Sequence, residues 1–323
     1  MRIVTNNATL RGTVQVPASK SLSNRALMIK AYLQQDERVQ LHNLSEGTDT
    51  RVMQTCLTQL ARYEGPLSLD CADAGTVFRF ILPLLAASEN KTITLKGTRR
   101  LLQRPIMPLI EALRTLGASI EVNKDLSLQI EGKRLRGGHL QIDASQSSQF
   151  VSALSLLAPT LPGGLSIELL GQRVSFPYIR MTLDVMAHFG VTYRQENNTL
   201  IIPEQAYVPQ ALPIENDWSS ASFYYAMGLF CKELDLFLPG LRSESLQGDA
   251  HVVNLAAQLG IQSTFRDGGV HLQKTKSLSE AELSNLCFDY TDYPDLAVPF
   301  IVACSALFPG VKSTGIQHLN LKE

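Results

Sequence analysis

The sequence predicts an α/β fold assembled from a repeated unit of helices and short strands. Three segments share one pattern, in which an amphipathic helix ends at a glycine and two short alternating strands follow. Upstream of each of these helices lies a second helix that is apolar nearly all round. Because such a helix has no polar face for solvent, we expect it at the centre of its domain, with sheets and amphipathic helices outside it.

Each apolar helix has a small polar start followed by an almost uninterrupted apolar run. We expect these helices at 19–33, 74–88, 147–159, 219–231 and 294–308. The runs are shorter than the roughly 20 residues that a membrane-spanning helix needs. We therefore expect them to be buried in a soluble core, with no membrane partner.

The amphipathic helices with their strands recur along the chain. They lie at 108–132, 179–204 and 251–274, with a less regular copy at 51–70. The helix-ending glycines Gly117, Gly190 and Gly260 recur about every 70 residues, which indicates internal duplication. The pattern breaks off at 315–323, where another amphipathic helix should begin. We therefore expect the sequence to stop inside its fifth unit and to leave half of a symmetric molecule incomplete.

Composition and motif searches exclude several functional classes. The 323 residues are 45% hydrophobic and 18% charged, with a formal net charge of −1, as in ordinary soluble domains. The five cysteines form no CxxC pair and mostly sit in apolar runs, which favours buried thiols in a cytoplasmic protein. Residues 1–16 alternate like a strand and lack the apolar core of a signal peptide. The six histidines are scattered, and the aromatic residues do not interleave with basic ones, so we expect neither a metal site nor a nucleic-acid partner.

The stretch PASKSLSNRAL (17–27) concentrates cations and hydroxyl groups at a helix start. A helix N-terminus is already an anion site because its first N–H groups are unpaired. Serine there is by default an N-cap, but capping needs one hydroxyl and does not account for Lys20 and Arg25 on either side of Ser21 and Ser23. Both cations oppose the helix dipole unless an anion lies between them, so the stretch predicts a bound phosphate.

Two further helix starts allow more than one interpretation. Arg104 stands just before Pro105, which we expect to open a helix, and it is either a second anion ligand or a solvated surface residue. Asp289, Asp292 and Asp295 lead into the helix at 294–308. Aspartate at a helix start is a routine cap. A carboxylate held ionised there, facing a substrate hydroxyl, is equally consistent with a general base.

Nine motifs resemble, in the same order, those of the 5-enolpyruvylshikimate-3-phosphate synthase family. They are PASKSLSNRAL (17–27), DAGTVFRF (73–80), QRPIMPLIEAL (103–113), DASQSSQFVSAL (143–154), FPYIRMTL (176–183), ENDWSSAS (215–222), GDAHV (248–252), YPDLAVP (293–299) and LKE (321–323). The resemblance covers the whole chain. It implies the inside-out α/β barrel fold of the enolpyruvyl transferases, with two domains built from repeated βαβαββ units.

The resemblance also implies the domain organisation. One domain combines 1–18 with 216–323 and is incomplete, and the other is the complete 19–215. We expect hinges near 18–20 and 213–217, because the family closes its two domains on the substrates. The family also implies a monomer.

The implied reaction transfers the enolpyruvyl group of phosphoenolpyruvate to the 5-hydroxyl of shikimate 3-phosphate and releases phosphate. This step belongs to the shikimate pathway of aromatic amino acid biosynthesis and uses no metal or organic cofactor. The matching positions for shikimate 3-phosphate are Lys20, Ser21, Arg25, Ser147, Ser148, Gln149, Ser175 and Tyr178. Gly75 and Arg104 match the contacts to phosphoenolpyruvate, and Lys20 lies between the two substrates.

The resemblance further implies the catalytic groups. Asp295 falls on the general base, Glu323 on the proton donor and Lys322 on its neighbour. Lys20, between the two substrates, is also placed among the catalytic groups. Two positions depart from the family, since Asp73 and His318 stand where asparagine is usual. A carboxylate at Asp73 beside an anionic substrate is unfavourable unless it is protonated or paired. The arginine that follows the LKE motif in the family and the later phosphoenolpyruvate ligands are absent, so we expect weak binding of shikimate 3-phosphate and no turnover from this chain.

Three rival interpretations remain. UDP-N-acetylglucosamine enolpyruvyl transferases share the fold, but SKSLSNR (19–25) and the absence of cysteine between Cys71 and Cys231 argue against that activity. A non-catalytic relative that binds phosphosugars is a second alternative. A purely structural repeat protein is the third, and it leaves the cations at the helix starts without a role.

Overall fold

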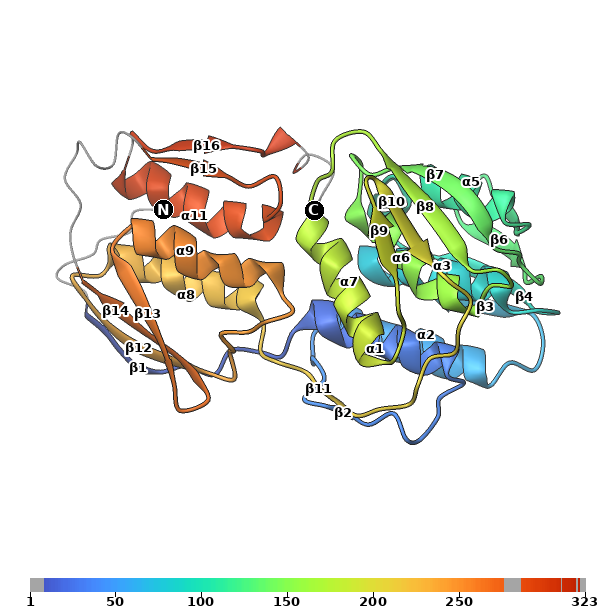
Figure 1. Cartoon of the computed structure of the whole chain (residues 1–323), viewed down its shortest axis with the longest axis horizontal. Helices are drawn as coiled ribbons and strands as arrows, with labels where there is room; N and C mark the ends of the chain where they lie inside the picture. The colour runs from blue at the N-terminus through green and yellow to red at the C-terminus, as the bar shows by residue number, and fades with distance from the viewer. Residues whose placement is uncertain (1–8, 276–285, 309, 318, 320–323) are drawn as a thin grey trace. The chain divides into compact units, whose positions relative to one another are not determined.

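The computed structural model describes residues 9–275, 286–308, 310–317 and 319, and within these the chain forms two compact units (Figure 1). The first unit combines the N-terminal segment up to Ser19 with Glu215–Leu319, and the second unit comprises Lys20–Ile214. The chain thus leaves the first unit after one strand and returns to it after completing the second. Cys56, Cys71, Cys231 and Cys304 are buried free thiols as predicted, whereas Cys287 is exposed at the start of a short strand.

The second unit contains two copies of a parallel strand–helix–strand arrangement followed by a hairpin. In one copy, β3 (Leu67–Asp70), α3 (Gly75–Ala87) and β4 (Thr92–Lys96) precede α4 (Arg99–Leu102), α5 (Met107–Thr115), β5 (Ser119–Val122) and β6 (Leu128–Glu131). In the other, β7 (Gly138–Asp143), α6 (Ser148–Leu157), a 3₁₀ turn (Ala158–Thr160) and β8 (Leu165–Leu170) precede α7 (Phe176–His188), β9 (Arg194–Glu196) and β10 (Thr199–Ile202). The sheet orders are β3-β4-β6-β5 and β7-β8-β10-β9, so the two copies have the same topology.

A third and smaller set of elements completes the second unit. It consists of α1 (Lys20–Tyr32), β2 (Leu41–His42), α2 (Thr48–Ala61) and β11 (Leu212–Pro213), with β11 pairing in parallel with β2. The predicted copy at 51–70 is therefore only partly confirmed. Its helix is present, but its strand is β3, which pairs in parallel with β4 of the next copy instead of forming a hairpin after α2.

Apolar helices form the core of the second unit, as the sequence predicts. Along α1, α3 and α6, the residues Met28, Phe80 and Phe150 are completely buried. The strands alternate buried and exposed residues, for example Leu140 and Gln141 in β7, so each sheet has one face on the helices and one outside. The sequence positions of the apolar helices are correct to within two residues at most of their ends.

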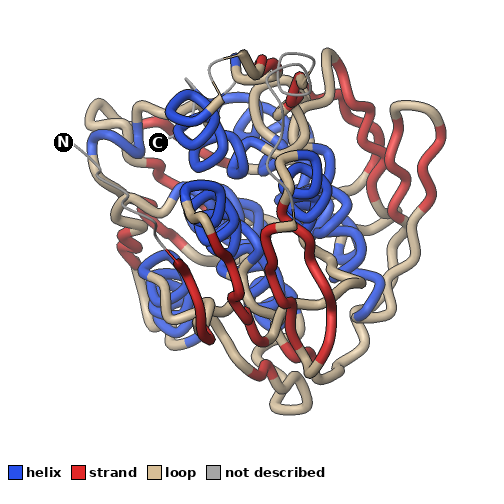
Figure 2. The backbone as a smooth tube through the Cα atoms, turned by 90° about the vertical axis from the view of Figure 1, so that its left-hand side faces the viewer, coloured by secondary structure: helices blue, strands red, loops and turns tan. Residues whose placement is uncertain are grey.

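The first unit repeats this plan with a strand contributed from the other end of the chain. Its elements are β1 (Thr9–Thr13), α8 (Trp218–Phe230), β12 (Glu233–Pro239), a 3₁₀ turn (Gly248–His251), α9 (Val252–Gln258), β13 (Ile261–Arg266), β14 (Gly269–Lys274), β15 (Cys287–Asp289), α11 (Pro294–Leu307) and β16 (Lys312–Thr314). β1 pairs in parallel with β12, and β15 with β16, so α8 and α11 take the places that α3 and α6 have in the second unit. Figure 2, which has this unit toward the viewer, shows strands beside a group of parallel-running helices.

Local signals explain where the amphipathic helices end. Gly117, Gly190 and Gly260 follow α5, α7 and α9 with φ angles of 103°, 82° and 86°. This left-handed backbone is readily adopted by glycine, which therefore terminates the helix and turns the chain into the following segment. Within the residues described, no helix combines the length and the apolar character that crossing a membrane requires.

Candidate active site

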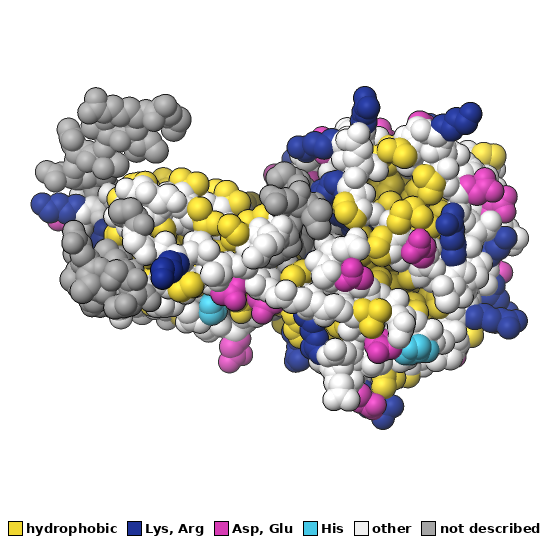
Figure 3. All heavy atoms as spheres, turned by 90° about the horizontal axis from the view of Figure 1, so that it is seen from above, with side chains coloured by type: hydrophobic (Ala, Val, Ile, Leu, Met, Phe, Trp, Pro, Cys, Tyr) yellow, Lys and Arg dark blue, Asp and Glu magenta, His cyan; other side chains and the backbone are white. Residues whose placement is uncertain are grey.

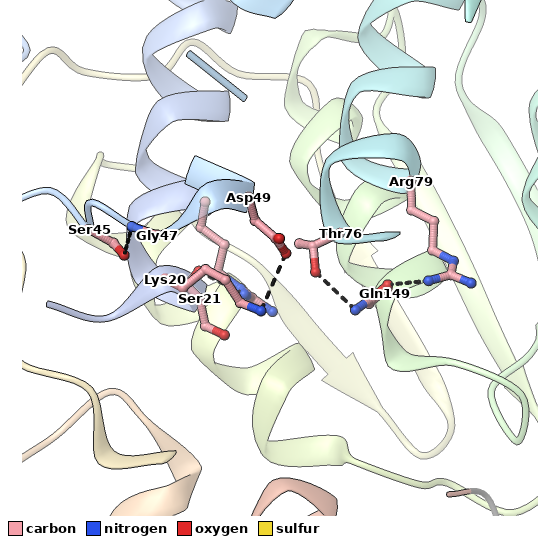
Figure 4. Close-up of polar contacts among 9 residues, drawn as sticks. Lys20, Ser21, Ser45, Gly47, Asp49, Thr76, Arg79 and Gln149 are labelled. Carbon is pink, nitrogen blue, oxygen red and sulfur yellow. Dashed lines mark hydrogen bonds and ion pairs between the residues drawn. The ribbon is translucent and has the colours of Figure 1, made fainter. Parts of the chain in front are cut away.

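The polar helix starts of the second unit are connected by side-chain hydrogen bonds. Lys20 is the first residue of α1, and its Nζ lies 3.3 Å from Oδ2 of Asp49 in the first turn of α2 (Figure 4). The Lys20 side chain is 46% exposed, whereas that of Asp49 is 22% exposed. Ser21 follows Lys20 and is partly buried. The first turn of α1 has no acidic residue of its own, so it keeps the positive end of its dipole available for an anion.

Arg25 lies one turn further along α1 and is only 3% exposed. Its Nε donates to Oγ1 of Thr182 at 2.7 Å, and its Nη2 donates to the carbonyl of Tyr178 at 2.9 Å, which connects α1 to α7. Its Nη1 donates to the carbonyl of Ser21 at 2.8 Å. Burial lowers the pKa of Arg25 to about 10, so it remains cationic at neutral pH. Arg25 therefore brings a buried positive charge to the start of α1.

Two guanidinium groups meet at the start of α3. A Cβ atom on Gly75 would lie 2.6 Å from Nη1 of Arg104 and 3.1 Å from Nη1 of Arg79. Only glycine leaves room for both arginines there. No side chain caps the start of α3, so no side-chain oxygen accepts from its first N–H groups. These N–H groups and the two guanidinium groups lie next to one another, and this combination favours a bound anion. Arg104 itself lies between α4 and α5, because the helix predicted to open at Pro105 begins at Met107.

Asp73, in the loop before α3, is exposed and paired. Its Oδ1 accepts a hydrogen bond from the hydroxyl of Thr98, and Nε of Arg100 lies 3.5 Å away. The hydrogen bond from Thr98, and after it the charge of Arg100, lower the pKa of Asp73 below its usual value. The carboxylate beside the site is therefore ionised and compensated by a cation, not protonated.

The start of α6 carries the residues Ser147, Ser148 and Gln149. Ser147 is the N-cap, and its Oγ accepts from the backbone N–H of Gln149 at 3.2 Å. The Gln149 side chain extends toward α3, where its Nε2 donates to Oγ1 of Thr76 at 3.1 Å and its Oε1 accepts from Arg79 Nη1 at 2.7 Å (Figure 4). Ser148 is buried. The side chain of Gln149 thus fixes the start of α6 against the first two turns of α3.

The start of α7 has an unusual backbone. Ser175 is buried and has φ 55° and ψ 36°, a left-handed conformation that costs a residue other than glycine roughly 1–2 kcal/mol. Residues held in this way cluster at ligand sites, where the surrounding structure maintains the strain. Tyr178 follows within the first turn and is partly buried.

The sequence interpretation missed two residues of this group. Asp49 and Arg79 bond to the side chains of Lys20 and Gln149, which the interpretation had selected. Thr76, which the sequence places beside the site, bonds to Gln149 as well. Arg79 had a detectable signal, because it is a charge inside the apolar run at 76–87. Asp49 had none, since acidic residues are common in the first turn of a helix.

The remaining predicted residues lie elsewhere or outside the described part of the chain. Asp295 is partly buried in the first turn of α11 in the first unit. Asp289 accepts hydrogen bonds from the N–H and the hydroxyl of Thr291, so it stabilises a turn before the helix and is not its N-cap. His318, Lys322 and Glu323 fall outside the residues that the structure describes.

Comparison with known proteins shows the family of the chain. The family model of EPSP synthase (3-phosphoshikimate 1-carboxyvinyltransferase) matches residues 4–323. A 3-phosphoshikimate 1-carboxyvinyltransferase of Bacteroides fragilis strain YCH46 is 37% identical over 97% of this chain and 75% of its own length. Relatives with the same name from Sulfurovum sp. and Tolumonas auensis are 35% and 34% identical, over 97% and 98% of this chain and 78% of their own lengths.

Solved structures support the predicted fold class. The structure of EPSP synthase from Acinetobacter baumannii superimposes with a TM-score of 0.69 at 18% identity, over 94% of this chain and 73% of that protein. At that identity the match concerns the fold alone, and it confirms the predicted α/β architecture. The family model and the identities of the relatives together place the chain in one family. The chain belongs to the EPSP synthase family.

Proposed function

We propose that this chain transfers the enolpyruvyl group of phosphoenolpyruvate to the 5-hydroxyl of shikimate 3-phosphate and releases phosphate, within the shikimate pathway. The observation that carries the proposal is the pair of guanidinium groups around Gly75, joined through Gln149 to the start of α6. The start of α3 has no side-chain cap, and the start of α6 is capped by Ser147. Together with Arg79 and Arg104, these two helix starts offer a site for two small anions. Both substrates are phosphates, and the relatives carry the name of this reaction.

The proposed roles in binding combine the family resemblance with the positions of these side chains. The proposed ligands of shikimate 3-phosphate are Lys20, Ser21, Arg25, Ser147, Ser148, Gln149, Ser175 and Tyr178. Gly75 and Arg104 receive phosphoenolpyruvate at the start of α3, with Asp73 and its partner Arg100 at the edge of the site. Arg25 is buried behind the first turn of α1, so it acts on an anion there mainly through its charge and by holding Ser21 and Tyr178.

The proposed chemistry is an addition followed by an elimination. Asp295 accepts the proton of the 5-hydroxyl as the oxygen attacks the substituted carbon of phosphoenolpyruvate, and Glu323 protonates the methylene carbon. The tetrahedral intermediate then loses phosphate, and one methyl proton departs to restore the double bond. Lys322 and His318 contribute charge and hydrogen bonding beside Glu323, and the positioning of both anions supplies much of the acceleration.

The organisation of the protein is part of the proposal. The units bounded at Ser19 and Ile214 are the two domains, and the chain crossings near 18–20 and 213–217 are the hinges. The N–H of Ser19 donates to the carbonyl of Glu215 at 3.0 Å, so the two crossings are bonded to each other. We also propose that the protein is cytoplasmic and that it is a monomer; light scattering of the purified chain tests the monomer.

Calorimetric titration with shikimate 3-phosphate tests the proposed function. Unphosphorylated shikimate is the matched control, because it lacks only the phosphate. We expect binding that requires the phosphate and that is lost in Arg25→Ala. Release of phosphate when phosphoenolpyruvate is added would overturn the expectation of no turnover and show the full reaction. No binding would contradict the proposal.

A further inference from the structure

Arg79 is a buried cation beside Gly75, and none of the proposed ligand contacts is assigned to it. It lies in the second turn of α3 within an otherwise apolar run and is only 4% exposed. Burying a charge is costly unless hydrogen bonds satisfy it, so a leucine or methionine would fill the same helix position more cheaply. The contacts of the guanidinium group therefore have to explain why an arginine stands here.

The guanidinium group of Arg79 bonds to two different elements. Its Nη1 donates to Oε1 of Gln149 in α6 at 2.7 Å, and its Nη2 donates to the carbonyl of Pro105 at 3.0 Å. Pro105 directly follows Arg104. The same planar group lies 5.5 Å over the ring of Phe150, the residue after Gln149. One rigid fork thus connects the start of α6 with the segment that carries Arg104.

These two elements belong to different proposed subsites. Gln149 is a proposed ligand of shikimate 3-phosphate, and Arg104 is a proposed ligand of phosphoenolpyruvate. The Gln149 side chain is fixed on its other side by Thr76, so it has little freedom that is independent of α3. If Gln149 moves toward a bound anion, it pulls on the hydrogen bond to Nη1 of Arg79. Because the guanidinium group is rigid, its Nη2 then shifts the carbonyl of Pro105, the residue after Arg104.

We propose that Arg79 is a positioning residue that couples the two substrate subsites, so that occupation of one increases the affinity of the other. The inference rests on the proposed function, because it takes the two anions from that reaction. The physical basis is the shared chain of hydrogen bonds: an anion that draws Gln149 toward it shifts the Arg79 guanidinium group and Pro105, and this places the Arg104 segment for the second anion. By thermodynamic linkage the effect is equal in both directions.

Arg79→Lys is the sharpest test of the coupling. Lysine keeps the positive charge and most of the apolar stem, but its single ammonium cannot present two parallel donors to two elements. We would measure the dissociation constant of shikimate 3-phosphate alone and with saturating phospholactate, the saturated analogue of phosphoenolpyruvate, which has no double bond to protonate. In the unmodified chain we expect phospholactate to tighten binding by a factor of about 5 to 150, the usual range for coupled sites. In Arg79→Lys we expect that factor to fall to about 2 or less.

The matched control is Arg180→Lys. Arg180 is an exposed arginine of α7 that pairs with Asp184 at 2.9 Å, so the same substitution there should leave the coupling factor unchanged. If Arg79 only supports the fold, Arg79→Lys will lower the melting temperature or weaken both affinities equally and leave the factor unchanged. That result would overturn the proposal.

A second variant covers the case in which Arg79→Lys does not fold, and the binding data separate failure of this proposal from failure of the proposed function. If Arg79→Lys does not fold, Thr76→Val removes the hydroxyl that fixes Nε2 of Gln149 and should reduce the coupling factor at least about twofold. An unchanged factor in Thr76→Val would then count against the proposal. A chain that does not bind shikimate 3-phosphate contradicts the proposed function. A chain that binds both ligands without any coupling contradicts only the role of Arg79.

Discussion

The two units share one plan of strands around apolar helices, yet their helices are buried to different extents. In the second unit α1, α3 and α6 pack together, and Phe80 on α3 has no exposed surface. In the first unit α8 and α11 pack against each other, and each keeps an exposed apolar pair. These pairs are Phe223 and Met227, both 51% exposed, and Val298 and Val302, 56% and 62% exposed. Figure 3 shows hydrophobic side chains at the surface of the unit on the left.

This difference shows that an apolar sequence all round a helix does not mean that every face of the helix is buried. Three such helices cover one another in the second unit, whereas in the described part of the first unit two helices leave one face of each open. The helix starts differ in their partners. In the second unit Gln149 of α6 bonds to Thr76 and Arg79 of α3. In the first unit Ser219 of α8 bonds to Asp249 in the 3₁₀ turn before α9. Asp217 caps its own helix by accepting from the N–H of Ser220 at 2.6 Å.

Truncating one phenylalanine in each unit should give the largest contrast. Phe80→Ala removes a fully buried ring from the centre of the second unit, so we expect a loss of about 3–5 kcal/mol in the free energy of unfolding. Phe223→Ala removes a half-exposed ring from α8 and should cost less than about 1 kcal/mol. Urea denaturation followed by far-ultraviolet circular dichroism measures both values. Equal losses would show that the α8 face is covered in solution.

A pair of glycine substitutions should separate binding from stability. Gly75→Ala places a Cβ against the flexible end of Arg104, so we expect the fold to survive and the affinity for phosphoenolpyruvate to fall about tenfold or more, as for the loss of a charged hydrogen bond. Gly228→Ala on α8 places its Cβ 2.7 Å from Cδ2 of Leu234, inside the core of the first unit. Overpacking there should cost about 1–3 kcal/mol. Calorimetry with phosphoenolpyruvate and urea denaturation of both variants would test these two expectations. The expectation for Gly75 is wrong if Gly75→Ala mainly lowers the free energy of unfolding.

The helices and the start of the site could be predicted from the sequence because their signals are local. Apolar runs place α3 and α6 within two residues, and Gly190 places the end of α7, which begins three residues before the predicted start at 179. The concentration of cations around Ser21 has no satisfactory explanation as capping alone, so the order of residues along the chain predicts an anion site there, and calorimetry with shikimate 3-phosphate tests that prediction.

What the sequence could not supply depends on long-range contacts. The parallel pairing of β1 with β12 joins segments on either side of the entire second unit, and no local pattern encodes it. The pairing of Asp73 with Thr98 and Arg100 depends on how β4 and α4 return to the start of α3. Arg79 was visible as a charge in an apolar run, but its two acceptors, Gln149 and Pro105, become neighbours only in the folded chain.

The smallest contrast concerns one acidic residue in each unit. Glu215, where the chain re-enters the first unit, is buried, and its Oε1 accepts from Ser245 at 2.8 Å and from the N–H of Leu246 at 3.2 Å. Burial raises the pKa of Glu215 above its ordinary value of 4.5, although these hydrogen bonds oppose the shift. Asp73 is exposed, and Thr98 and Arg100 lower its pKa below 3.8. The two carboxyl groups should therefore affect stability with opposite signs.

For Glu215 the folded state holds the proton more tightly than the unfolded state, so its contribution to stability is complete below pH 4.5 and is lost as pH rises through its folded pKa. Glu215→Gln keeps the Oε1 acceptor without the charge, so the fall in stability with rising pH should disappear. At pH 7 we therefore expect the variant to be at least as stable as the unmodified chain. Asp73→Asn should instead remove a small contribution that is present above pH 3.8 and lost as pH falls further. Urea midpoints of the three proteins between pH 3 and pH 8 decide the matter. If the Glu215→Gln profile runs parallel to that of the unmodified chain, Glu215 is solvated in solution, and the segment by which the chain re-enters the first unit is more open than its hydrogen bonds indicate.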